Sequence, residues 1–246
     1  MADITALKTR NAARWAAAKI TRGPEFDRVA TRLVMAKPRY QALSERTGVP
    51  WFVIAVIHER EAGQNFSKSI AQGDPWNAKS VHVPKGRGPF KTFEEAAIDA
   101  LTNCAPYAAK WKDWSAGGTM TLLEQYNGLG YANKGLPSPY NWSGTDQYKS
   151  GKYVADGVFD PNAVDKQLGC AGLIIAMQTL DPSIKFGPPV SLPSPTVQPK
   201  HVAVAASLTG GLVAVLRANS VEIALGGVAI AVIIAIAIHF LWKKKD

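Results

Sequence analysis

The apolar run at residues 51–57, followed at once by the charged run His58–Glu61, constrains the fold more than any other part of the sequence. Pro50 precedes the first run and Gly63 follows the second, and such residues typically stand at the first turn and just past the end of a helix. A helix that is apolar on all sides must lie inside the protein. We therefore predict a buried helix over residues 51–61, although its β-branched residues would also permit a strand.

Most of the first 186 residues show helical periodicity or capping signals. Gly23-Pro24 breaks the first amphipathic segment, Thr92 and Glu95 form a capping box, and Asp160-Pro161 is a typical helix start. The fold class is therefore predicted to be mostly α-helical, with further helices over about residues 1–20, 25–36, 40–46, 92–104, 119–127 and 160–180. A small β element is expected near residues 80–90, and an ordered, aromatic loop over 128–159.

Charge and cysteine content exclude several kinds of protein. The net charge of +9 is concentrated in residues 1–46, which carry +6 and suit an anionic polymer or surface, or simply a solvated helix face. No nucleic-acid-binding stripe and no nucleotide motif is present, so nucleic acid is not expected as a partner. The four scattered histidines show no metal-ligand spacing, and no cofactor is implied. Cys104 and Cys170 are expected as buried free thiols, with a disulfide as the alternative.

The C-terminal part differs in composition from the rest. Five prolines in residues 187–200 predict a semi-extended linker, and residues 201–246 form an apolar tail. Residues 223–242 contain 20 residues without a formal charge, about 30 Å of helix, which is enough to cross a bilayer core. Three lysines follow and favour a cytoplasmic C-terminus, so that the body would face the cell wall. The first 20 residues do not have the form of a signal peptide.

The predicted buried helix ends with two carboxylates. Successive helical residues turn by about 100°, so Glu59 and Glu61 lie about 200° apart and face opposite ways. A carboxyl packed against apolar residues at a helix C-terminus has its protonated form favoured, which suits a general acid near neutral pH. One of the two is therefore expected to face a cleft and the other a structural partner; both could instead be surface residues.

Several short motifs, in this order, resemble those of goose-type lysozymes and lytic transglycosylases. Residues 60–63 resemble the Arg-Glu-Ser segment of those enzymes, Gly73-Asp74 their Gly-Asp pair, residues 124–128 their Tyr-Asn-x-Gly motif, and Tyr153-Val154 their Tyr-Val element. The chain resembles more closely phage and bacterial lysozyme-like proteins, over roughly residues 48–175. It departs from the pattern at Ala62, where serine is usual, and it lacks the Gly-Leu-Met-Gln segment of transglycosylases.

The resemblance implies an α+β lysozyme-like fold and assigns roles to particular residues. Glu61 would be the general acid, with Glu59 as the alternative, and Asp74 would place the water if the reaction is hydrolysis. Without a second carboxylate, a sugar hydroxyl would close an anhydro product. Candidate substrate-binding residues offer polar groups or flat faces to sugars, and each could equally be a core residue: Tyr126, Asn127, Tyr131, Tyr140, Trp142, Tyr153 and His82.

The sequence thus predicts a peptidoglycan-degrading glycosidase, a lysozyme or lytic transglycosylase of the phage endolysin type. Its catalytic domain would occupy residues 1–186, ahead of the linker and a membrane helix at about 223–242. The expected partners are peptidoglycan glycan strands and a membrane, and the expected location is a membrane or a virion. The alternative is a non-catalytic, membrane-anchored wall-binding or virion structural protein.

Overall fold

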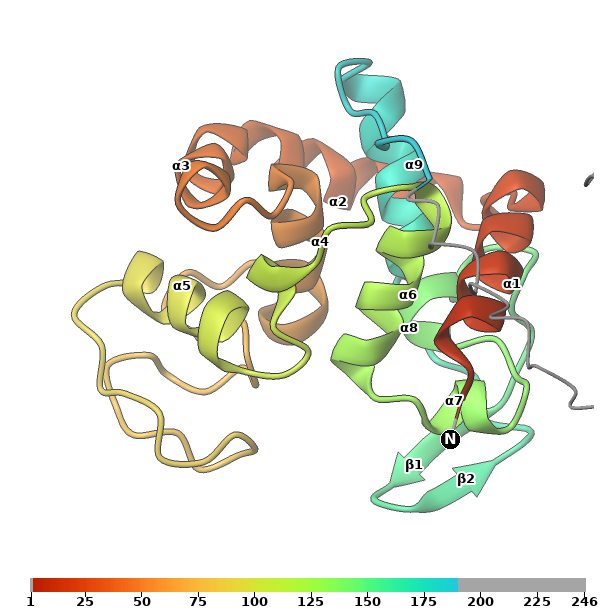
Figure 1. The fold of residues 1–246 in the computed structure, drawn as a ribbon. Coiled ribbons are helices and arrows are strands. Elements are labelled where there is room, and N and C mark those ends of the chain that lie inside the picture. The colour runs from red at the N-terminus through yellow and green to blue at the C-terminus, as the bar shows by residue number, and fades with distance from the viewer. Residues whose placement is uncertain (1, 190–246) are drawn as a thin grey trace, which may run out of the picture. The chain divides into compact units, whose positions relative to one another are not determined.

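Helix α4 (Trp51–Ala62) contains seven successive buried residues and forms the middle of the core (Figure 1). The structure is a computed structural model that describes residues 2–189. Within them, in chain order, lie α1 (Ile4–Ala17), α2 (Gly23–Met35), α3 (Lys37–Thr47), α4, α5 (Phe93–Asn103), the 3-10 turn η1 (Ala108–Lys110), α6 (Ala116–Asn127), α7 (Gly130–Asn133), α8 (Pro139–Trp142), β1 (Lys152–Ala155), β2 (Val158–Asp160) and α9 (Cys170–Leu180).

The predicted start and end of α4 are confirmed. Pro50 stands immediately before the helix, and Gly63 adopts a left-handed conformation with φ 59°. The Gly63 N–H donates to the Glu59 carbonyl at 2.9 Å, and the next N–H, of Gln64, donates to the His58 carbonyl at 3.3 Å. These bonds end the helix just after its two carboxylates and satisfy carbonyls that would otherwise lack partners.

The buried face of α4 packs against several other helices. Helices α2, α3 and α9 contact α4, α2 also lies along α9, and α1 packs on α6. Helix α9 has no charged residue and buries seven of its residues. In Figure 1, α5 and residues 64–91 lie on one side of α4, while α6, α8 and the β-hairpin lie on the other. The C-terminal end of α4 therefore lies between two different sets of elements.

The mostly helical fold is confirmed, but the prediction for the β element is wrong in position. Residues 80–90 form turns without a strand, and the two strands are β1 and β2, paired antiparallel. The backbone N–H groups of Val81 and His82 donate to the Asp74 carboxylate and so are not available to a partner strand. The turn between β1 and β2 is Asp156-Gly157, with Gly157 at φ 70°, a dipeptide typical of hairpins.

Other boundaries also differ from the predictions. Helix α6 begins at Ala116 because the Ser115 hydroxyl accepts the Gly118 N–H at 3.1 Å, and residues 128–142 contain α7 and α8 rather than loop alone. Helix α9 begins at Cys170, not near residue 161. The Asp160 carboxylate does accept the N–H groups of residues 162 and 163, but this bonding closes only a turn.

The two cysteines are buried and free, as expected. Within residues 2–189, no helix combines the length and apolar character that a membrane span requires. The predicted membrane helix at 223–242, and the linker from residue 190 on, lie outside the described residues and stay predictions.

Candidate functional site

Glu61 lies in the last turn of α4 and is partly buried. Its Oε1 accepts a hydrogen bond of 2.8 Å from the hydroxyl of Tyr140, a buried residue of the short helix α8. Burial raises the pKa of Glu61 to about 7, against smaller lowering effects of the Tyr140 hydrogen bond and the Arg60 charge. Near neutral pH this carboxyl is therefore present in both protonation states, as a group that donates and later recovers a proton requires.

Glu59 faces a different environment, as the helical spacing predicts. Its Oε2 accepts a hydrogen bond of 3.0 Å from Gln64, the residue that follows the helix end. Burial raises the pKa of Glu59 too, against smaller lowering effects of the Gln64 hydrogen bond and of the charges of Arg32 and Arg60. The two carboxylates thus have separate partners and do not act on one bond.

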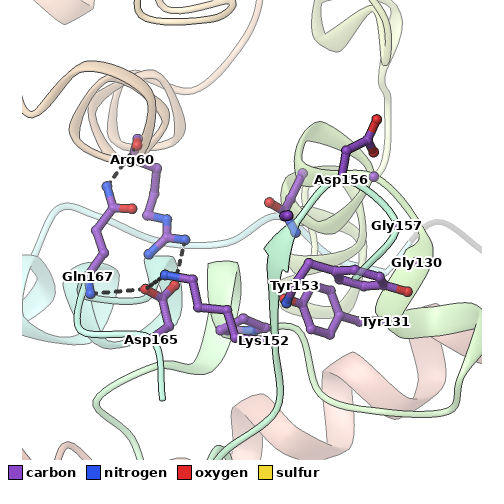
Figure 2. Close-up of a pocket in the computed structure, with 13 residues that line it drawn as sticks. Arg60, Gly130, Tyr131, Lys152, Tyr153, Asp156, Gly157, Asp165 and Gln167 are labelled. Atoms are coloured by element: carbon purple, nitrogen blue, oxygen red, sulfur yellow. Dashed lines mark hydrogen bonds and ion pairs between the residues drawn. The ribbon is translucent and has the colours of Figure 1, made fainter. Parts of the chain in front are cut away.

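Arg60 connects the end of α4 with the segment before α9. Its guanidinium lies over the Tyr140 ring at 4.6 Å and donates to Asp165 at 3.2 Å and to the Leu168 carbonyl at 3.2 Å. Lys152 of β1 binds the other oxygen of Asp165 at 3.0 Å (Figure 2). Burial alone would raise the pKa of Asp165, but these two cations hold it below its usual value. Asp165 is therefore a carboxylate at neutral pH.

A cavity of about 550 Å³ lies beside this cluster. It contains three of the predicted substrate-binding residues, Asn127, Tyr131 and Tyr153. The Tyr131 and Tyr153 rings meet edge to face with centroids 5.1 Å apart. Glu61 does not line the cavity; its sequence neighbour Arg60 does. The lining residues are Arg60, Asn127, Gly128, Gly130, Tyr131, Pro139, Lys152, Tyr153, Ala155, Asp156, Gly157, Asp165 and Gln167.

Tyr126 and Tyr140, also predicted to bind substrate, are located next to Glu61 and do not line the cavity. The Tyr126 hydroxyl donates to the Ile70 carbonyl at 3.3 Å. Burial is the largest cause, and the nearby charge of Glu61 the second, that raises the pKa of each tyrosine well above the usual value for tyrosine. Both hydroxyls therefore stay protonated and act as donors. Trp142, the remaining predicted stacking residue, is fully buried in the core and offers no free face.

Asp74 and His82 form a clasp within the segment between α4 and α5. Asp74 Oδ1 lies 2.6 Å from His82 Nδ1, and Oδ2 accepts the N–H groups of Val81 and His82 at 2.8 and 3.0 Å. These bonds, with the His82 N–H contributing most, lower the pKa of Asp74. Asp74 is buried, whereas 71% of the His82 side chain is exposed.

Gly73 brings this clasp to the end of α4. Its φ is +74°, and a Cβ placed on it would lie 2.6 Å from the Glu61 carbonyl oxygen. Only a glycine fits here without a shift of the backbone. The predicted Gly-Asp pair thus lies against Glu61, but both oxygens of Asp74 are already engaged by the loop.

Sequence reasoning missed the roles of Arg60, Lys152, Asp165 and Gln167. The amide of Gln167 donates to the Arg60 carbonyl at 2.7 Å and completes the cluster. The sequence offers no local signal for this cluster, because its members lie on three separated segments. Among residues 2–189, no group of His, Cys, Asp or Glu side chains is arranged to hold a metal ion.

Comparisons of this chain with protein-family models, with curated proteins and with solved structures found no match. The chemistry of Glu61 and its surroundings therefore remains the guide to function.

Proposed function

We propose that this protein cleaves the β-1,4 glycosidic bond of peptidoglycan, with Glu61 as the general acid. One observation carries the proposal: a single carboxyl at the end of a buried helix has a pKa of about 7 and a tyrosine hydroxyl on one oxygen. The preceding residue, Arg60, lines a cavity that also has aromatic and amide groups in its wall. Raised pKa values at a cleft are a recurrent mark of catalytic acids.

In the proposed reaction, protonated Glu61 transfers its proton to the oxygen between two amino sugars. The bond from that oxygen to the anomeric carbon breaks, the electron pair stays with the oxygen, and positive charge develops on the sugar ring. The Tyr140 hydroxyl stabilises the carboxylate that Glu61 becomes. An attacking hydroxyl then bonds to the anomeric carbon and returns its proton to Glu61.

The state of Asp74 supports a route that uses one carboxylate. Its carboxylate already accepts three hydrogen bonds from Val81 and His82, so it serves the loop conformation. With Glu61 acting as acid and then as base, the attacking group would be a hydroxyl of the cleaved sugar itself. The products would then end in an anhydro sugar and not in a reducing end.

The substitution Glu61→Gln tests the proposal. It keeps the size and an acceptor oxygen for Tyr140 but has no proton to give, so clearing of purified cell walls should fall by at least about 1,000-fold while wall binding persists. Glu59→Gln is the matched control, because Glu59 lies two residues away with a different partner, and it should keep most of the activity.

Mass analysis of the fragments distinguishes anhydro ends from reducing ends. Undiminished clearing by Glu61→Gln would disprove the assignment. A wild-type chain that binds walls but releases no fragments would instead support the alternative, a non-catalytic wall-binding protein.

A further inference from the structure

The end of the cavity at Arg60 has more positive than negative charge. Arg60 and Lys152 both bind the one carboxylate of Asp165, at 3.2 and 3.0 Å. Asp165 is ionised at neutral pH, since the two cations keep its pKa low. The cluster of these three residues therefore carries a net charge of +1.

Both cations also have donors to spare. The Arg60 side chain is only 6% exposed, yet its Nε has no hydrogen-bond partner among the described residues. A buried, charged donor without an acceptor is costly. The Lys152 side chain is 40% exposed at the cavity wall, and a lysine ammonium has three donors. Of the two cations, Lys152 is thus the one whose donors are open to one more anionic group.

One further acidic residue lines the cavity. Asp156 lies in the turn between β1 and β2 and is exposed. In Figure 2 its carboxylate points away from the Arg60–Asp165–Lys152 cluster, which lies on the other side of the view. Asp156 therefore does not neutralise the excess charge at the Arg60 end.

We propose that this end of the cavity binds a carboxylate of the ligand, with Lys152 as the main contact. The identity of the polymer rests on the proposed function. Each muramic acid of peptidoglycan carries a carboxylate, on its lactyl ether where no peptide is attached or on its stem peptide where one is, whereas chitin has the same sugar linkage and no carboxylate. Lys152 thus selects peptidoglycan over neutral amino-sugar polymers, a difference that aromatic stacking on Tyr153 does not provide.

Binding to the full-length chain tests this without relying on cleavage. Calorimetry would compare Glu61→Gln with Glu61→Gln/Lys152→Met, using three ligands of equal sugar number: a peptide-free muramyl glycan, the same glycan with stem peptides, and a chitooligosaccharide. Loss of one charge-assisted bond at a partly exposed site should weaken the carboxylate ligands roughly tenfold and leave the chitooligosaccharide unchanged. Lys152→Arg should restore binding.

The three ligands also distinguish the two sources of the carboxylate, because the lactyl carboxyl is free only in the peptide-free glycan and is an amide where a stem peptide is attached. Weakening of the peptide-free ligand alone points to the lactyl carboxylate, weakening of the peptide-bearing one alone points to the stem peptide, and weakening of both shows that the site accepts either. Lys149→Met is the matched control, because Lys149 is an exposed lysine close in sequence that does not line the cavity.

An equal loss for the chitooligosaccharide, or no loss for any ligand, would overturn the proposal, as would a failure of all three to bind. Failure of the proposed function gives different results, namely wall clearing by Glu61→Gln or the release of no fragments by the wild type.

Discussion

Replacing Glu61 by Gln should stabilise the folded protein at neutral and alkaline pH, because the wild-type carboxylate is held where it is poorly solvated. Burial places its pKa at about 7 in the folded state, against an ordinary value of 4.5. At 1.36 kcal/mol per pH unit, this difference amounts to about 3 kcal/mol of folding free energy. The neutral amide of the variant has no charge to bury, so its folding free energy lacks this unfavourable contribution at every pH. It can still accept the Tyr140 hydrogen bond.

The sign follows from which state binds the proton more tightly. The folded state does, since its pKa is higher, so this group's contribution to stability is present below about pH 4.5 and is lost as the pH rises to about 7. Urea unfolding of wild type and variant should therefore give similar free energies near about pH 4.5, and a gap of up to about 3 kcal/mol in favour of the variant near about pH 8.5. A gap that is constant with pH, or that closes as the pH rises, would refute the reasoning.

Two further substitutions probe the surroundings of Glu61. Tyr140→Phe removes the donor that favours the ionised carboxyl, so the alkaline limb of the pH profile of kcat/KM should move up by roughly one pH unit; an unchanged limb would contradict this contact. Gly73→Ala places a methyl group 2.6 Å from the Glu61 carbonyl oxygen at φ +74° and should cost about 2–4 kcal/mol in urea unfolding. Gly157→Ala, at φ +70° with open space around it, is the control and should cost only about 1 kcal/mol.

The sequence predicts well those features that depend on neighbouring residues. Helix α4 follows from an uninterrupted apolar run with Pro50 before it and Gly63 after it. The opposite orientation of Glu59 and Glu61 follows from helical geometry alone. The capping box is nearly right: the Thr92 hydroxyl accepts the Glu95 N–H at 3.1 Å, but the Glu95 carboxylate accepts the N–H of Lys91 and not that of Thr92.

The sequence predicts poorly those features in which a distant group competes for the backbone. The alternating residues Val81 to Val83 resemble a strand. The Asp74 carboxylate accepts two of their N–H groups, however, so this segment forms turns and no strand. The hairpin of β1 and β2 had a usable local signal, Asp156-Gly157 between apolar residues, which the high content of glycine and polar residues in 128–159 obscured. The Arg60–Asp165–Lys152 cluster had none, because only the fold brings these residues together.

The same contacts that orient Glu61 also explain why its acidity is set by burial and not by its neighbouring cation. Arg60 is adjacent in sequence and would strongly favour the charged carboxylate if its guanidinium faced Glu61 alone. Asp165 and the Leu168 carbonyl instead hold that guanidinium over the Tyr140 ring. Its effect on the pKa of Glu61 is therefore smaller than that of burial. Asp165, far from Glu61 in the sequence, thus keeps the cation occupied, and Glu61 is still partly protonated near neutral pH.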